Sequence, residues 1–259
     1  MNYFGDEKRI IEWLHTHCTR VETITDVDKA AENVIESIIN PEKWPLWINS
    51  ANKNDPPPDF YCPKAQIMME VMRIDDHTFV GKKGGVVNET NARESQIQKE
   101  LRQLFPDTSH IVVNAVTDLP GKEDHNYSRY LESIKRVTAQ HIKHIDLYRK
   151  NHPGYKLVFF IFDESSAYCE TTNQDVIQNG IKEGQPIEGR KHLFFGDKAM
   201  LESLRNVDVD YLLWFAPFKR FFNVDESEQL PSVWFYDLKK VSWDELLEYP
   251  IGNMVSMEE

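Results

Sequence analysis

Two carboxylates eleven residues apart are the strongest chemical signal in this chain. Asp59 follows the prolines of DPPPDF, and Glu70 is embedded in the apolar run IMMEVM. A carboxylate in such a run is costly to bury unless a partner or a metal ion compensates its charge. If 59–62 and 67–74 are neighbouring strands joined by a turn at Pro63, the two carboxylates converge. Two carboxylates with open water positions suit Mg²⁺ or Mn²⁺, so the pattern predicts a metal site. A partly exposed edge-strand glutamate is the alternative.

The elements that must position this pair follow from the apolar periodicity of the chain. The predicted helices span 6–17, 26–39, 92–105, 127–150 and 198–206. The predicted strands span 60–62, 67–74, 78–83, 111–117, 156–162, 209–218 and 231–238, with GKKGG at 81–85 as a hairpin turn. Thr25 is the predicted N-cap of the second helix. In the third helix, the spacing predicts inward-facing Ile97, Leu101, Leu104 and Phe105. The pattern is typical of one α/β domain.

Composition narrows the functional class. The 259 residues are 41% hydrophobic and 12% aromatic, enough to bury a large core. A net charge of −12 argues against a protein that coats nucleic acid non-specifically, although it leaves room for a local basic face. Cys18, Cys62 and Cys169 are odd in number and far apart, which argues against a disulfide framework or a thiolate zinc site. With no signal peptide and no long apolar stretch, we expect a cytoplasmic protein without a membrane partner.

The carboxylate pattern resembles the PD-(D/E)xK nuclease superfamily, which has the restriction-endonuclease-like fold. PDF at 58–60, ten intervening residues and EVM at 70–72 carry the resemblance. The family core runs helix, three strands, helix, strand, which is the order predicted over 26–118. The chain pattern predicts a single α/β domain over 1–259. Its nuclease-like core would be 26–118, and further helices and strands would occupy 119–259.

The resemblance also implies an activity. It makes Asp59 and Glu70 ligands of Mg²⁺ or Mn²⁺ in a nuclease that hydrolyses phosphodiesters, with DNA as the expected substrate. The family has lysine two residues after the glutamate, on the same strand face, where this chain has Met72. Either Lys64, Lys82 or Lys83 replaces that lysine, or the site no longer cuts. In the second case the chain is an inactive nuclease-like module with a protein partner. A chance match is a third reading, because such short patterns recur.

A basic segment offers a place for the phosphate backbone. The predicted helix 127–150 carries an excess of four positive charges. The expected nucleic-acid contacts are Lys135, Arg136, Lys143 and Arg149. A solvated amphipathic face is the alternative. His141 and His144 on this helix lack a third ligand at metal spacing, so they are interpreted as surface or half-buried histidines.

A rival site follows the apolar strand predicted at 156–162. Asp163 and Glu164 come directly after it, and acids at the carboxyl ends of strands in open α/β sheets often face a ligand crevice. The same residue types are common where a strand leads into a turn. An unrelated α/β enzyme centred on Asp163 is therefore the other functional hypothesis.

Overall fold

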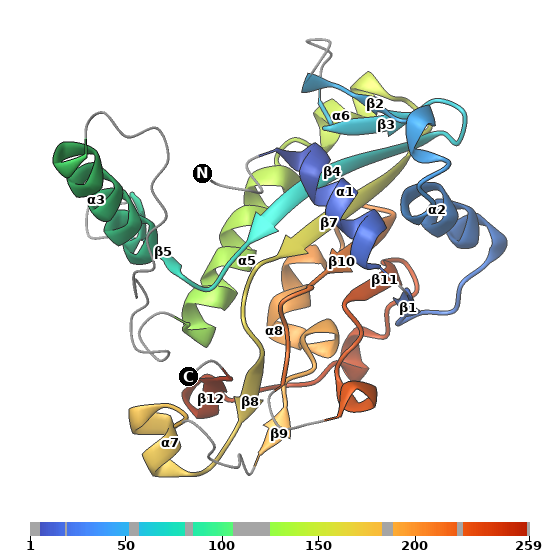
Figure 1. Ribbon diagram of the computed structural model, residues 1–259. Helices are drawn as coiled ribbons and strands as arrows, with labels where there is room; N and C mark the ends of the chain where they lie inside the picture. The colour runs from blue at the N-terminus through green and yellow to red at the C-terminus, as the bar shows by residue number, and fades with distance from the viewer. Residues whose placement is uncertain are drawn as a thin grey trace.

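A seven-stranded sheet forms the centre of the computed structural model, which describes residues 6–18, 20–51, 57–80, 85–105, 125–182, 189–221 and 225–257. In spatial order its strands are β1 (Glu22–Thr23), β11 (Val233–Asp237), β10 (Tyr211–Phe215), β7 (Lys156–Asp163), β4 (Ile67–Ile74), β3 (Phe60–Cys62) and β2 (Ile48–Asn49) (Figure 1). The chain is therefore a mixed α/β protein, as its sequence predicts.

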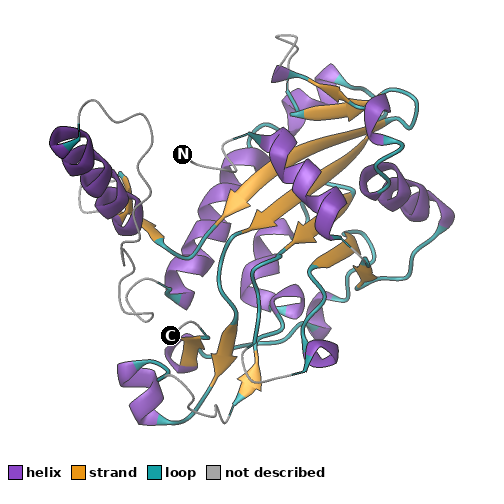
Figure 2. Cartoon of the chain, in the orientation of Figure 1, coloured by secondary structure: helices purple, strands orange, loops and turns teal. Residues whose placement is uncertain are grey.

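The strand directions determine which strand ends meet at each edge of the sheet. Strands β4, β7 and β10 are parallel neighbours, whereas β2, β3 and β4 pair antiparallel. Strand β11 runs antiparallel to β10, and β1 runs parallel to β11. The carboxyl ends of β4, β7 and β10 therefore meet at one edge of the sheet, as the arrowheads in Figure 2 show.

Helices cover both faces of this sheet. Along β7, Leu157, Phe159 and Ile161 face one core cluster, and Val158, Phe160 and Phe162 face the other. A strand buried on both faces reads as a continuous apolar run, which explains KLVFFIF. Helices α1 (Glu7–His17) and α2 (Lys29–Ile39) pack on the second face. Helices α5 (Tyr127–Ile142), α6 (Ile145–Asn151) and α8 (Lys198–Leu201) pack on the first.

Two local predictions about helices are wrong. Helix α2 is capped by Asp28, whose Oδ1 accepts from the N–H groups of Ala30 and Ala31 at 3.0 and 2.9 Å. Thr25 instead accepts a hydrogen bond from the Asp237 N–H at 3.0 Å. The single helix predicted over 127–150 is two helices, because the backbone leaves the α-helical path at the turn of 143–144 between α5 and α6.

The segment after β4 leaves the central sheet. Strands β5 (Thr78–Val80) and β6 (Val86–Asn88) form a separate two-stranded sheet, and α3 (Glu89–Leu104) follows it (Figure 1). Leu104 is 71% exposed and Phe105 is 50% exposed, so the prediction that they face inward is wrong. The parallel neighbour of β4 is β7, which lies outside the segment 26–118. The predicted strand 111–117 lies outside the described residues.

A smaller sheet lies beyond the carboxyl end of β7. It consists of β12 (Met254–Ser256), β8 (Tyr168–Glu170) and β9 (Arg190–Lys191), with α7 (Gln174–Asn179) beside it (Figure 1). Short 3₁₀ turns cover Trp44–Leu46, Phe194–Gly196, Glu202–Leu204, Glu226–Glu228, Trp243–Glu245 and Ile251–Asn253. The predicted helix 198–206 is thus α8 followed by a 3₁₀ turn. In the part of the chain that is described, no helix has the length and apolar character needed to cross a bilayer.

Candidate functional site

The structure brings Asp59 and Glu70 together, as the sequence predicts. Strands β3 and β4 pair antiparallel, and the last pair is Phe60 opposite Met69. Asp59 and Glu70 lie one residue beyond that pair. The Asp59 N–H donates to Glu70 Oε2 at 3.2 Å, and the Val71 N–H donates to Asp59 Oδ2 at 2.8 Å. Each carboxylate is therefore held by the backbone of the neighbouring strand.

The chain that leads into Asp59 is held in place by side chains from two other segments. Ser50 Oγ donates to the Pro58 carbonyl at 2.6 Å, and the Ser50 N–H donates to the Asp59 carbonyl at 2.9 Å. Asn151, at the end of α6, donates to the Pro57 carbonyl at 2.6 Å. These bonds fix the backbone that carries the first carboxylate.

Glu70 is buried, with 6% of its surface exposed, and helices α5 and α6 compensate its charge. The Tyr148 hydroxyl donates to Glu70 Oε1 at 2.7 Å. His141 Nδ1 lies 2.7 Å from the same oxygen. The turn between α5 and α6 lets one side chain from each helix reach this carboxylate. His141 is thus half-buried, as predicted, but its role at the site could not be inferred from the sequence.

The Asp59 carboxyl group has a strongly raised pKa. Burial and the negative charge of Glu70 raise the pKa of Asp59 to about 7, with a smaller contribution from Glu7 of α1, while the Val71 N–H and His141 oppose the shift. Within the described part of the chain, no donor reaches Asp59 Oδ1. In this part of the chain Asp59 therefore keeps one oxygen without a donor, and the carboxylate oxygens of the pair form a donor set that fits Mg²⁺ or Mn²⁺.

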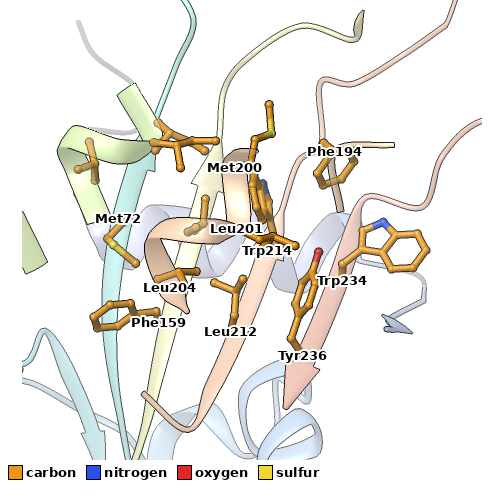
Figure 3. Packing of buried hydrophobic residues seen from close by; sticks show 14 of the residues in the cluster. Met72, Phe159, Phe194, Met200, Leu201, Leu204, Leu212, Trp214, Trp234 and Tyr236 are labelled. Atoms are coloured by element: carbon orange, nitrogen blue, oxygen red, sulfur yellow. The ribbon is translucent and has the colours of Figure 1, made fainter. Parts of the chain in front are cut away.

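Of the predicted lysines, only Lys64 lies in the described segments, and the structure does not place it beside this pair. Met72 is 1% exposed and packs in the core near Phe159 and Leu204 (Figure 3). Lys64 lies in the turn at the other end of the β3–β4 hairpin, three residue pairs away from Asp59 and Glu70. It lines a cavity of about 590 Å³ on the α2 side of the sheet. Lys82 and Lys83 lie outside the described residues.

The four predicted nucleic-acid contacts do not form one cationic face. Arg149 donates to Asp208 at 3.0 Å and to Asp210 at 2.9 Å, so its guanidinium group is already used within the fold. Arg136 donates to Thr78 at 3.3 Å. These bonds favour a structural role for both arginines.

The two lysines of that set differ in their positions. Lys135 lines a cavity of about 610 Å³ together with Glu202 and Glu248. Lys143 is exposed in the turn between α5 and α6, two residues after His141. Lys143 and Arg149 lie within two residues of His141 and Tyr148, which contact Glu70. Because Arg149 is engaged with Asp208 and Asp210, Lys143 is the exposed cation of the two.

Asp163, the centre of the rival hypothesis, is closed off by buried partners. The Tyr130 hydroxyl and Trp214 Nε1 both donate to its Oδ2, the latter at 3.0 Å. Lys219 Nζ lies 3.3 Å from the same oxygen, and both charged groups are almost fully buried. Glu164 pairs with Arg73 at 2.7 Å. This arrangement links β7, α5 and β10 in the core and favours a structural role for Asp163.

A second group of polar residues, which sequence reasoning missed, surrounds Asp76 after the end of β4. His125 Nδ1 lies 3.1 Å from Asp76 Oδ1, and His77 Nε2 lies 3.7 Å from it. Burial by itself would raise the pKa of the Asp76 carboxyl. The two histidines and the Tyr168 hydroxyl outweigh burial and lower this pKa to about 2. Only the adjacency of Asp76 and His77 is visible in the sequence, because His125 follows 48 residues later and no spacing links them.

Comparisons of the chain with protein-family models, with curated proteins and with solved structures returned no match. A functional assignment therefore rests on the geometry of these sites.

Proposed function

We propose that this protein is a divalent-metal-dependent nuclease of the PD-(D/E)xK type, in which Asp59 and Glu70 hold Mg²⁺ or Mn²⁺. The observation that carries the proposal is the opposed, partly buried carboxylate pair, which raises the pKa of Asp59 to about 7. Two such acids disfavour each other's charge, and a divalent cation between them would remove that cost. The oxygen-only donor set is the kind that hard cations prefer.

The order of elements around the pair supports the proposal. In chain order, helix α2, strands β2, β3 and β4, helix α5 and strand β7 build and cover the central sheet, with helix α6 between α5 and β7. This is the order helix, three strands, helix, strand of the restriction-endonuclease-like core. The proposed core therefore uses α5 and β7, with the β5–β6 hairpin and α3 inserted between β4 and α5.

The residues around the pair have separable roles in the proposed reaction. A bound Mg²⁺ ion would supply an activated water and stabilise negative charge on the phosphodiester. Glu70 is oriented for binding by Tyr148 and His141, in the way that outer hydrogen bonds orient metal ligands. Lys143 is the proposed contact to a phosphate of DNA.

Calorimetric titration with Mn²⁺ tests the proposal, using wild type, Asp59→Asn, Glu70→Gln and the double variant. We expect one ion per chain in wild type and no measurable binding in the double variant. In parallel, wild type with Mg²⁺ or Mn²⁺ should cleave DNA, and the double variant should not. Lys64→Ala is the matched control and should retain both properties, because Lys64 lies at the other end of the hairpin. Absence of Mn²⁺ binding that depends on Asp59 and Glu70 would overturn the proposal.

The burial of Met72 favours a second candidate, an inactive nuclease-like module that binds a protein partner. A buried thioether at this position cannot orient a water or stabilise charge on a phosphate. Under this reading the carboxylate pair binds Mn²⁺, but no DNA or RNA substrate is cleaved. The same titration and cleavage assays separate the two candidates, since only the first requires turnover.

A further inference from the structure

A cluster of metal-ligand side chains lies away from the Asp59–Glu70 pair, at the carboxyl end of β4. Asp76 and His77 follow β4 after one intervening residue, and His125 directly precedes the segment that leads into α5. The end of β4 at Ile74 is already about 13 Å along the strand from Glu70, at roughly 3.3 Å per residue. The cluster is therefore a separate site that the proposed nuclease reaction does not use.

Three ligand atoms converge in this cluster. Asp76 Oδ1, a ring nitrogen of His77 and a ring nitrogen of His125 all lie within 4.8 Å of one another. The Asp76 carboxylate is fully buried, His125 is nearly buried and the side chain of His77 is 23% exposed. Three donors at this separation can bind a single ion after small movements of the two rings.

Hydrogen bonds from Ser166 and Tyr168 hold Asp76 Oδ2, so Oδ1 faces the two histidines. Oδ2 accepts from the Ser166 N–H at 3.2 Å, from Ser166 Oγ at 3.1 Å and from the Tyr168 hydroxyl at 2.5 Å. Ser166 Oγ lies 2.9 Å from Ser256 Oγ of β12. Outer partners of this kind orient a carboxylate that binds a metal ion and are commonly needed for high affinity.

An open volume adjoins one of the histidines. A cavity of about 210 Å³ is lined by His125, Asn126 and Ser256 together with Ile177 of α7 and Gly252. It lies where the start of α5, helix α7 and strand β12 meet. Catalytic and regulatory metal sites keep a coordination position for water or a ligand beside three protein donors, and this cavity provides the space for one.

We propose that Asp76, His77 and His125 bind one borderline divalent transition-metal ion of the Zn²⁺ type, with a further coordination position facing the cavity. The mixed set of two imidazoles and one carboxylate favours Zn²⁺ over Mg²⁺, which prefers oxygen donors. The chain would thus carry two metal sites of different chemistry. Oxygen donors form the first on β3 and β4, and nitrogen and oxygen donors form the second at the end of β4.

Zn²⁺ calorimetry on chelator-treated full-length protein tests this site, together with the visible absorption of bound Co²⁺ as a probe of nitrogen coordination. Wild type should bind one high-affinity Zn²⁺. His77→Gln and His125→Gln should each weaken that binding at least about 100-fold, because even loss of an outer partner commonly costs 10–100-fold. His144→Gln, at an exposed histidine in the α5–α6 turn, is the matched control and should bind like wild type.

The Asp59→Asn/Glu70→Gln variant separates this site from the proposed nuclease site. It should retain high-affinity Zn²⁺ binding and lose the Mn²⁺ binding that depends on Asp59 and Glu70, whereas the His77 and His125 variants should show the reverse. Circular dichroism of the metal-free variants checks that they fold. If His125→Gln does not fold, the result for His77→Gln decides the question, because His77 is the more exposed ligand. Zn²⁺ affinity unchanged in a folded His77→Gln variant, or no stoichiometric Zn²⁺ in wild type, would overturn the inference.

Discussion

His141 in α5 and Glu70 in β4 are in direct contact, with Nδ1 of the histidine 2.7 Å from Oε1 of the glutamate. The contact joins two residues 71 positions apart in the chain. It explains how a carboxylate can sit in the run IMMEVM, since the helices on this face supply the compensating donors. It also makes the helix pair α5–α6 part of the candidate site.

Removing the second donor to Glu70 should weaken both the fold and the metal site. In Tyr148→Phe, the buried carboxylate loses a hydrogen bond of 2.7 Å. We expect the free energy of unfolding to fall by about 1–2 kcal/mol and Mn²⁺ affinity to fall by about 10–100-fold. Urea unfolding and calorimetry measure the two effects. Tyr155→Phe is the control, and an unchanged Mn²⁺ affinity in Tyr148→Phe would contradict the orienting role.

Asp59 should destabilise the metal-free protein at neutral and alkaline pH. Its pKa in the folded state is about 7, above the value of about 3.9 for an unfolded chain. The folded state therefore binds more protons than the unfolded state between these values, and stability falls as pH rises from about 4 to 7. Asp59→Asn should be more stable than wild type by roughly 3–4 kcal/mol at pH 8 and equal to it below pH 4.

Metal ions give this prediction an internal check. Saturating Mg²⁺ or Mn²⁺ should stabilise wild type at pH 8, because the cation binds the two carboxylates and offsets their repulsion. The stability of Asp59→Asn should not change, because this variant lacks one of the two carboxylates. Unfolding by urea at pH 4 and pH 8, with and without the ion, measures both effects. If the difference in unfolding free energy between wild type and Asp59→Asn is the same at pH 4 and pH 8, the pKa of Asp59 is not raised.

Met72 should not tolerate the lysine that the resemblance implies. Its side chain is buried beside Phe159 and Leu204 (Figure 3), so a charged amine there would lack a partner. We expect Met72→Lys to lower the free energy of unfolding by about 3–5 kcal/mol, whereas the volume-conserving Met72→Leu should cost less than about 1.5 kcal/mol. Thermal unfolding compares the two variants. A stable Met72→Lys that cleaves DNA faster than wild type would show instead that the amine reaches the carboxylate pair.

Asp210 should be a main contributor to stability at neutral pH. Burial by itself would raise the pKa of its carboxyl. Lys239, the Leu157 N–H and Arg149 outweigh burial and lower this pKa to about 2. Because this pKa lies below the unfolded value, the contribution is present above about pH 4 and is lost as pH falls toward 2. Asp210→Asn should cost about 1–3 kcal/mol at pH 7, and the difference should shrink below pH 4.

Asp208 offers a matched control for this prediction. It also pairs with Arg149, at 3.0 Å, but its side chain is mostly exposed. Exposed ion pairs contribute little because water and salt screen them, so Asp208→Asn should change stability by less than about 0.5 kcal/mol. Equal effects of the two substitutions in urea unfolding would show that burial does not distinguish them.

The sequence by itself determined the features that depend on near neighbours. The run KLVFFIF predicted a strand buried on both faces, and α1 and α2 follow from helical spacing of apolar residues. The pairing of Asp59 with Glu70 was also predictable, because a short turn at Pro63 joins two strands and fixes which residues oppose each other.

Only the tertiary structure decided the contacts between segments far apart in the chain. Periodicity says which face of an element is apolar but not which element covers it. Periodicity therefore could not show that Tyr148 and His141 contact Glu70, that Met72 is buried in the core, or that Asp76 contacts His125. The pairing of β4 with β7 could not be predicted for the same reason. It joins residues 89 positions apart, and it depends on how the helices between the two strands pack, which no local pattern records.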